Sequence, residues 1–307
     1  MSAKTVISGI LLLDKPQGIS SHSALAKAKF LFKSDSQDSK KAGHTGTLDP
    51  MATGLLPLVF GEATKFAQYG LDADKGYTAT IRLGAATDSG DADGQVIDHQ
   101  AVPSFDQAML DAIADAMTGA QSQIPPMYSA LKKDGKKLYE YARDGIEIER
   151  APRAITIHHL SLTKLGDDAI LLDVVCSKGT YVRVLGEDIA KRLGTVGHLT
   201  RLHRTMTGGF GVDDAITTDA LDALPMSERL GRLLPIDAML THLPTLMVSD
   251  DEAARLKLGQ RLNVKDRALS LAVFDETCLV RLYLGDEFIG LGEVASTGRL
   301  QPKKLVA

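Results

Sequence analysis

The chain has 307 residues, of which 44% are hydrophobic and 24% charged, a composition typical of a globular protein with a sizeable buried core. Its cysteines, Cys176 and Cys278, lie far apart without a CxxC pattern, which excludes a disulfide framework and a cysteine zinc site. With no secretion signal before Asp14 and no apolar run of membrane-spanning length, we expect a cytoplasmic protein without a membrane role. The net charge of −4 disfavours a protein that binds nucleic acid over most of its surface. The middle of the chain is nevertheless basic, because residues 121–209 hold 14 Lys and Arg against 10 Asp and Glu.

The first predicted strand spans residues 8–13 and ends in a turn over residues 14–18. A helix follows, because apolar residues recur at helical spacing after Ser21 or Ser23, either of which can cap it. The polar run at residues 33–41 has nothing apolar to bury and predicts a mobile loop.

Residues 43–54, with the sequence GHTGTLDPMATG, are turn formers that enclose an imidazole and a carboxylate. The apolar run at residues 55–60 then predicts a buried strand that anchors this loop. A reactive loop on a rigid strand suits catalysis, but Asp49 before Pro50 is also a common turn initiator. The local sequence leaves both interpretations open.

Helical and strand patterns alternate irregularly through the middle of the chain. We expect a helix over residues 62–71, a strand over residues 77–83, and a helix over residues 105–117 that Ser104 caps and Gly119 closes. Further strands follow at residues 155–157 and 170–176, and a further helix at residues 182–193. This irregular order predicts an α/β (α+β) fold with a mixed, largely antiparallel sheet rather than a doubly wound one.

Residues 124–143 interrupt this pattern with an insertion. Residues 124–130 are extended, and a basic turn leads into a short helix over residues 138–143. The turn carries Lys132, Lys133, Lys136 and Lys137. These lysines suit RNA binding, but they would equally keep a protruding loop soluble.

The end of the chain predicts a separate small domain. We place a boundary near residue 248, followed by a helix over residues 250–258. Short strands then recur with the spacing of a small β barrel, at residues 269–274, 279–284 and 288–291.

Common cofactor motifs are missing from the sequence. There is no Walker lysine, no HExxH and no dinucleotide fingerprint, so no nucleotide cofactor is indicated. Residues 88–94 resemble a calcium loop, but Gln100 stands where a bidentate Glu is needed. A solvated turn is the preferred interpretation for Asp93, while Asp91 stays open. We expect no metal site.

Two segments are typical of anion binding. In residues 177–183 a strand enters a glycine turn and a helix start with Tyr181 and Arg183, where Arg183 could bind phosphate, pair with a carboxylate, or lie on the surface. In residues 199–205, alternation would place the polar side chains of a strand on one face suited to phosphates, as in any amphipathic strand. Taken alone, the first segment favours an ordinary structural role, whereas for the second segment the two interpretations are equally good.

Taken together, these motifs resemble the TruB family of tRNA pseudouridine synthases. The similarity begins at LLDKPQGISS and GHTGTLDPMATG and covers roughly the first four-fifths of the chain, with the last residues similar to a PUA domain. It continues in family order through GEATK, KGY, DSGDADG, PMYSALK, CSKGTYVR and LHRT. The sequence departs from the family pattern in two places. The polar run before GHTG is longer than expected, and Gly76 stands where some relatives carry a basic residue.

The resemblance implies a fold and an activity. It implies a pseudouridine synthase domain over residues 1–248, with an RNA-clamping insertion at about 124–152, and a PUA-like RNA-binding domain over residues 249–307. The family isomerises uridine 55 in the T arm of tRNA, without a cofactor. We therefore expect tRNA as the partner of a monomeric enzyme.

The resemblance also assigns residues. Asp49 corresponds to the family's nucleophile, which attacks either the ribose C1′ or the uracil C6. Tyr77 would stack on the target base, with its hydroxyl a candidate to assist proton transfer, and Arg183 would pair with Asp49. The expected substrate-binding residues are His44, Tyr181, Leu202, Asp91, Lys132 and Lys136.

Two rival functions remain for comparison. One is a noncatalytic RNA-binding or RNA-chaperone protein on the same scaffold, which would not require a carboxylate beside RNA phosphates. The other is a phosphotransferase that uses Asp91 and Asp93, which is disfavoured because no apolar strand leads directly into that pair.

Overall fold

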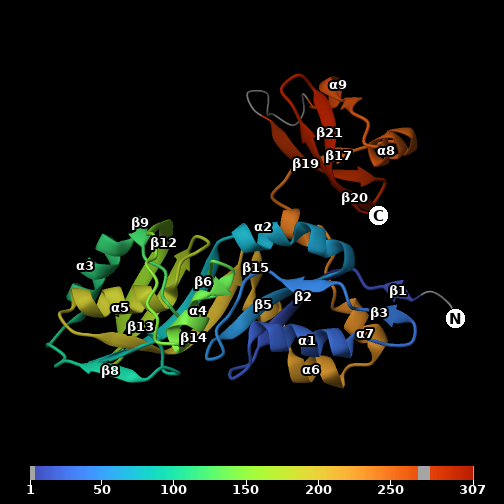
Figure 1. The fold of residues 1–307 in the computed structure, drawn as a ribbon. Helices are drawn as coiled ribbons and strands as arrows, with labels where there is room; N and C mark the ends of the chain where they lie inside the picture. Colours follow the sequence, from blue (N-terminus) through green and yellow to red (C-terminus); the bar gives the residue numbers. More distant parts are fainter. Residues whose placement is uncertain (1–3, 269–276, 307) are drawn as a thin grey trace.

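A computed structural model describes residues 4–268 and 277–306 (Figure 1). Across these residues, a ten-stranded mixed sheet forms the larger part of the molecule. Most neighbouring strands are antiparallel, whereas β14 with β5 and β16 with β2 are parallel, so the expected mixed, largely antiparallel sheet is confirmed. The main path of the sheet runs in the order β16 (Ile216–Thr217), β2 (Gly9–Lys15), β5 (Thr53–Phe60), β14 (Gly197–Thr207), β6 (Lys75–Leu83), β13 (Ala169–Cys176), β12 (Arg153–Lys164) and β9 (Gly119–Gln123).

In the middle of this sheet, three strands that are far apart in the sequence lie side by side. β14 lies between β5 and β6, and Arg204 is paired with Gly54 on one side and with Tyr77 on the other. β4 (Ala42–His44) adds to the same sheet by pairing with β5. The loop of residues 43–54 is therefore tied to the centre of the sheet at both ends.

Helices cover the sheet and complete its core. α1 (Ser21–Leu31) contacts β4, α3 (Gln107–Met117) contacts β12, and α5 (Val182–Arg192) contacts β14 and β6. Phe32 after α1 packs on Phe60 of β5, with ring centroids 5.3 Å apart, and both side chains are fully buried. None of the helices in residues 4–268 and 277–306 is long and apolar enough to span a membrane.

The caps of two helices differ from the prediction. Ser20 caps α1 by accepting a hydrogen bond from Ser23 N, because Ser20 has the extended backbone that an N-cap requires and Ser21 is already helical. Asp106, not Ser104, caps α3, where its carboxylate accepts from Met109 N at 2.9 Å. In both cases the residue with the right backbone conformation is the cap.

The polar run at residues 33–41 is not wholly a loop, so that prediction was wrong. It contains β3 (Gln37–Asp38), which pairs in parallel with β1 (Thr5–Val6). The expected helix over residues 62–71 begins as a 3₁₀ helix, η1 (Gly61–Phe66), and continues as α2 (Ala67–Asp72). The polar edge strand β9 carried no strand pattern in the sequence and was missed.

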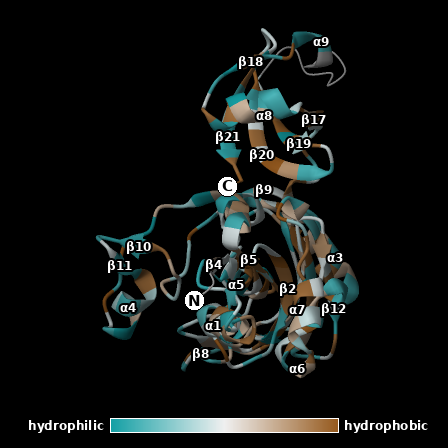
Figure 2. Ribbon diagram, turned by 90° about the vertical axis from the view of Figure 1, so that its right-hand side faces the viewer, coloured by the Kyte–Doolittle hydropathy of each residue, from teal (hydrophilic) through white to brown (hydrophobic). Residues whose placement is uncertain are grey.

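The segment of residues 124–152, called the clamp insertion here because the family resemblance implies that role, projects from the body of the molecule (Figure 2). It holds the two-stranded hairpin of β10 (Lys132–Lys133) and β11 (Lys136–Lys137), followed by α4 (Leu138–Arg143). The helix predicted over residues 138–143 is confirmed to the residue. A separate two-stranded hairpin, β7 (Ala85–Thr87) with β8 (Val96–His99), flanks the loop that carries Asp91.

A second sheet stands apart from the first (Figure 1) and forms the small C-terminal β domain that the sequence predicts. Its own apolar core includes Val280, Leu282 and Leu300, and α8 (Asp250–Lys257) packs on it with Ser249 as its cap. The predicted strand at residues 269–274 lies outside the described residues. Within them, five strands pair in the order β17 (Thr245–Met247), β19 (Cys278–Leu284), β20 (Glu287–Val294), β21 (Arg299–Leu305) and β18 (Leu262–Asn263).

A buried polar cluster joins the two sheets. The Asp237 carboxylate accepts from Arg281 Nη1 at 3.0 Å and from the Tyr283 hydroxyl, and only 8% of its side chain is exposed. Phe66 of η1 meets Phe288 of β20 beside this cluster, with ring centroids 5.4 Å apart. The C-terminal sheet is thus fixed by an ion pair and an aromatic contact together.

We predict that Asp237→Ala lowers the free energy of unfolding by about 2 to 4 kcal/mol, because it leaves the mostly buried Arg281 guanidinium without its counter-charge. Urea unfolding measures this difference. Asp251→Ala is the control, since Asp251 in α8 is 80% exposed in its ion pair and should change stability by no more than about 0.5 kcal/mol. Equal losses in both variants would contradict the role given to the cluster.

Candidate active site

The loop of residues 43–54 is held by hydrogen bonds to its neighbours. Ser21 Oγ accepts from Leu48 N at 2.7 Å and lies 3.0 Å from Leu48 O, so the start of α1 fixes the loop just before Asp49. Pro50 O accepts from Gly18 N at 2.8 Å on the other side of Asp49. The position of Asp49 is therefore set by the turn and the helix that follow β2.

Two buried cations lie beneath this loop. The Arg204 side chain donates from Nε to Leu55 O at 2.6 Å and from Nη2 to Gly46 O at 3.3 Å, and Arg204 is 1% exposed. Lys15 is fully buried and its ammonium donates to Pro16 O, Ile19 O and, at 3.5 Å, Pro50 O. Burial lowers the pKa of Lys15 to about 8, although the Asp49 charge acts in the opposite direction.

Asp49 in this loop forms an ion pair with Arg183 at the start of α5. Arg183 Nε lies 3.0 Å from Asp49 Oδ2, and the side chains of these residues are 5% and 37% exposed, respectively. The other guanidinium nitrogens of Arg183 donate to backbone carbonyls, Nη1 to Ser89 O and Nη2 to Tyr128 O at 2.6 Å. The guanidinium is thus locked in place, while the carboxylate remains accessible.

Asp91 is a second carboxylate beside Arg183. Its Oδ2 lies 3.6 Å from Arg183 Nε, and its Oδ1 accepts from the Ser89 hydroxyl at 2.6 Å and from Asp93 N at 3.1 Å. Asp91 is only 4% exposed, so it is a buried partner of Arg183 and not a solvated turn residue. One guanidinium therefore faces two carboxylates.

The electrostatic balance at Asp49 follows from this arrangement. Burial raises the pKa of Asp49 above its ordinary value, and the charges of Asp91 and Asp93 act in the same direction. Arg183 and, more weakly, Lys15 lower the pKa and favour the carboxylate. A poorly hydrated carboxylate with a raised pKa is more basic than one in water, which suits a nucleophile.

The remaining predicted pocket residues lie on the surrounding strands and the start of α5. Tyr77 on β6 and Tyr181 before α5 are partly buried, and burial raises the pKa of each hydroxyl, with a smaller contribution from the Asp49 charge. The positive charge of Arg204 acts on the pKa of the Tyr77 hydroxyl in the opposite direction. Leu202 on β14 is 7% exposed and belongs to the central core. The structure thus brings Tyr77, Tyr181 and Arg183 around Asp49.

His44 lies on β4, at the start of the same loop. Burial lowers the pKa of its imidazole, and the positive charge of Arg204 and the neighbouring His22 act in the same direction. Among the residues that the structure describes, its buried Nδ1 has no hydrogen-bond partner. The His44 residue as a whole is partly exposed, although this nitrogen is buried.

Lys132 and Lys136 do not join this cluster. Lys132 is exposed in the clamp hairpin, whereas Lys136 pairs with Asp144 and lies over the Tyr141 ring, 4.6 Å from its centroid. The residues described include no group of three or more His, Cys, Asp and Glu side chains that could hold a metal ion. His158 instead pairs with Asp74 at 3.3 Å.

Comparison with known proteins identifies the family. A model of the TruB family pseudouridylate synthase N-terminal domain matches residues 34–182, and a model of the pseudouridine synthase II TruB C-terminal region matches residues 244–306. The chain is 50% identical to tRNA pseudouridine synthase B of Psychrobacter cryohalolentis over 99% of this chain and 95% of that protein. The chain belongs to the TruB family of pseudouridylate synthases.

Other relatives agree with this assignment. The chain is 50% identical to tRNA pseudouridine synthase B of Aromatoleum aromaticum over 99% of this chain and 94% of that protein. A chain in the crystal structure of a Cbf5-Nop10-Gar1 complex has the same fold, with a TM-score of 0.71 at 23% identity over 97% of this chain and 85% of that one. The TruB-family fold therefore extends over nearly the whole chain.

Two buried residues of this TruB-family site were missed from the sequence. Arg204 follows His203 on β14, and alternation places it on the inward face, opposite the predicted polar face of Arg201, His203 and Thr205. Alternation predicted that the inward face would be apolar, although Arg204 itself stands in the LHRT motif. Lys15 lies in a segment interpreted only as a turn, where its proximity to Pro50 could not be seen.

Gly54 is the point where the loop meets Arg204 most closely. Its φ of +99° disfavours any side chain, and a Cβ there would lie 2.3 Å from Arg204 O. We predict that Gly54→Ala lowers the free energy of unfolding by about 3 kcal/mol or more in urea titrations. Gly209→Ala is the control, because nothing lies within 4 Å of its added Cβ, and it should cost no more than about 1 kcal/mol. A tolerated Gly54→Ala would contradict this close packing.

Proposed function

We propose that this TruB-family enzyme isomerises uridine 55 in the T arm of tRNA to pseudouridine, acting as a monomer in the cytoplasm. Its near-full-length relatives at about 50% identity carry the name tRNA pseudouridine synthase B. The observation that carries the proposal is the accessible Asp49 carboxylate paired with the buried Arg183 guanidinium. A binding protein has no need of such a group beside RNA phosphates.

The chemistry requires one bond to be exchanged for another. The bond from ribose C1′ to N1 of uracil breaks, the base rotates, and C1′ joins C5; C5 then loses its proton and N1 gains one. No oxidation, reduction or hydrolysis is involved. Asp49 can hold the intermediate by adding either to C1′ or to C6 and then leaving, as carboxylates do in covalent glycosidase chemistry.

The neighbours of Asp49 suit distinct tasks. Arg183 favours the ionised form of Asp49 and fixes its direction, and the buried Asp91 in turn fixes Arg183. The face of Tyr77 offers a stacking surface for an unstacked uracil, and its hydroxyl is the candidate to assist proton transfer at C5. We assign these residues to catalysis on that basis.

Substrate binding involves the surrounding residues and the clamp insertion. The target uridine must leave its stack, at a cost on the order of a few kcal/mol that binding must offset. Tyr181 and Leu202 would line the pocket that receives the base, and the neutral His44 would lie where the base leaves the RNA. Lys132 and Lys136 would contact RNA phosphates from the clamp.

In this proposal the two sheets have different functions. The residues before β17 form the catalytic unit, and the chain from β17 onward, which begins a few residues before the boundary expected at residue 248, forms a PUA-like unit that binds RNA. The Asp237 cluster supports this arrangement because it fixes the second unit relative to the first. RNA that contacts both units would then be oriented over the loop of residues 43–54.

We predict that Asp49→Asn abolishes pseudouridine formation while RNA affinity stays within a few fold, because the amide keeps the shape but is not a nucleophile. The enzyme is incubated with a T-arm stem-loop, pseudouridine is mapped at each position, and binding is measured separately. Asp115→Asn on the exposed face of α3 is the control and should retain activity. Undiminished product with Asp49→Asn would reject the mechanism, and absence of product at uridine 55 with the wild-type enzyme would reject the substrate.

The clamp lysines generate a separate prediction. Replacing Lys132 and Lys133 with Gln should flatten the salt dependence of RNA binding by about 0.7 to 0.9 log unit for each phosphate that the clamp no longer neutralises. Lys136→Gln should have a smaller effect, because its ammonium is already paired with Asp144. Lys33→Gln with Lys40→Gln, two exposed lysines after α1, is the matched control for the removal of two positive charges. A slope unchanged by the clamp substitutions would show that the clamp lysines do not bind phosphates.

A further inference from the structure

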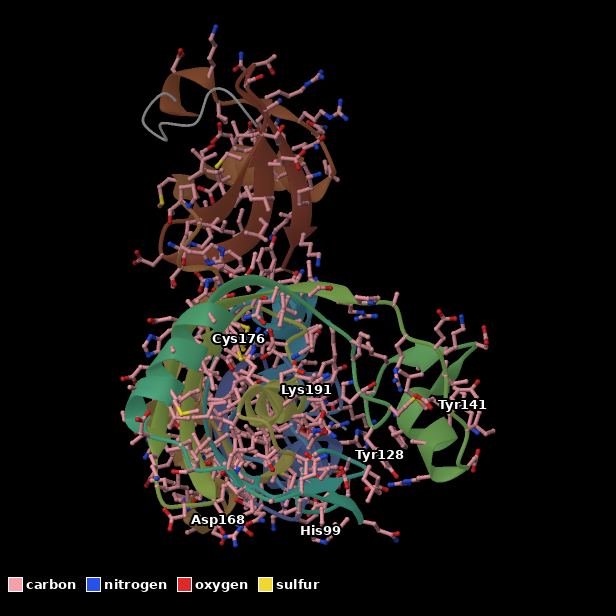
Figure 3. The ribbon with its side chains drawn as sticks, turned by 90° about the vertical axis from the view of Figure 1, so that its left-hand side faces the viewer. His99, Tyr128, Tyr141, Asp168, Cys176 and Lys191 are labelled. Carbon is pink, nitrogen blue, oxygen red and sulfur yellow. The ribbon has the colours of Figure 1, made fainter. Side chains whose placement is uncertain are left out.

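The clamp insertion is connected to Arg183 through Tyr128. Figure 3 shows Tyr128 where the clamp meets the body of the molecule, whereas Tyr141 lies out in the clamp itself. The backbone carbonyl of Tyr128 accepts from Arg183 Nη2 at 2.6 Å. Its hydroxyl donates to Asp88 Oδ2 at 3.0 Å. One residue at the clamp's attachment thus makes two hydrogen bonds to the surroundings of Asp49.

Asp88 belongs to the turn that holds Arg183 from the opposite side. Asp88 Oδ1 accepts from Gln95 N at 2.8 Å, and Asp88 N donates to Gln95 O at 3.0 Å, which closes the turn over residues 88–95. The same turn supplies Ser89 O and Asp91 as partners of Arg183. The Tyr128 hydroxyl therefore ties the clamp attachment to the turn that orients the guanidinium.

The hydrogen bonds of the clamp reach this attachment directly. Tyr139 N at the start of α4 donates to Ser129 O at 3.2 Å, and Leu138 N donates to Leu131 O at 2.8 Å. Ser129 is buried and directly follows Tyr128 in the chain. A displacement of α4 would therefore act first on Ser129 and its neighbour Tyr128.

We propose that Tyr128 is a positioning residue that couples the seating of RNA on the clamp to the orientation of the Arg183–Asp49 ion pair. The inference rests on the proposed function, because it assigns a role within that reaction. RNA held by the clamp fixes Tyr128, Tyr128 fixes Arg183, and Arg183 aims the Asp49 carboxylate. Small errors in the direction of a nucleophile carry large rate penalties, so even an outlying hydrogen bond affects the rate.

The test is Tyr128→Phe, which removes the hydroxyl and leaves the backbone carbonyl. Under single-turnover conditions with saturating tRNA, we expect the rate constant for pseudouridine formation to fall by about tenfold, the effect of one hydrogen bond to a charged group. The Kd for RNA should change by less than about twofold. Tyr69→Phe is the control, because Tyr69 lies on α2, outside the Asp49 cluster, and it should leave the rate constant unchanged.

The pH profile separates positioning from a purely structural role. If Arg183 is less well oriented, it lowers the pKa of Asp49 less, so the acid limb of the rate profile should move to higher pH in Tyr128→Phe. An unchanged rate constant, a loss confined to Kd, or a slower rate with an unmoved acid limb would each overturn the inference. A wild-type enzyme that forms no pseudouridine in the same assay would overturn the proposed function instead.

Discussion

The burial of the Arg183 guanidinium is the constraint on which the rest of the site depends. A buried charge is tolerated when it is paired with an opposite charge and hydrogen-bonded, and Arg183 has the carboxylates of Asp49 and Asp91 and two backbone carbonyls as partners. These partners come from distant segments of the chain, so the guanidinium fixes their relative positions. Because two carboxylates share one cation, the more accessible one keeps negative charge that is not fully neutralised. That residual charge is what a nucleophile at Asp49 needs.

The loop that carries Asp49 is supported by a second set of buried cations. Arg204 and Lys15 bind backbone carbonyls rather than carboxylates, so they hold the loop while leaving the Asp49 charge to Arg183. Arg204 also approaches the Tyr77 hydroxyl, which places the stacking surface relative to the same loop. Two carbonyls of the glycine-rich loop, Gly46 O and Pro50 O, are thereby paired without being drawn into a helix or a sheet.

The sequence predicted most elements because their hydrophobic periods were strong, as in β5, β6, β13 and α5. It missed β3 and β9, whose polar residues pair only through tertiary context, and it misplaced caps that depend on one backbone angle. At the site, local pattern left Asp49 undecided between a turn and a nucleophile. Its pairing with Arg183 was expected only through the family resemblance, since no local pattern links positions so far apart. Arg204 was missed because a strand's buried face is assumed to be apolar.

The separation between the clamp lysines and the Asp49 cluster has an energetic consequence. Phosphate contacts on exposed lysines supply binding energy but carry no information about the base, whereas the pocket recognises a base only after it has left its stack. Binding energy gained at the clamp therefore assists the reaction only if it reaches the pocket through a structural connection. The hydrogen bonds of Tyr128 are such a connection, because one ends on Arg183, the partner of the proposed nucleophile, and the other ends on Asp88 in the turn that holds Arg183. RNA seated on the clamp would in this way stabilise the ion pair that orients Asp49, which would tie reactivity to correctly seated RNA.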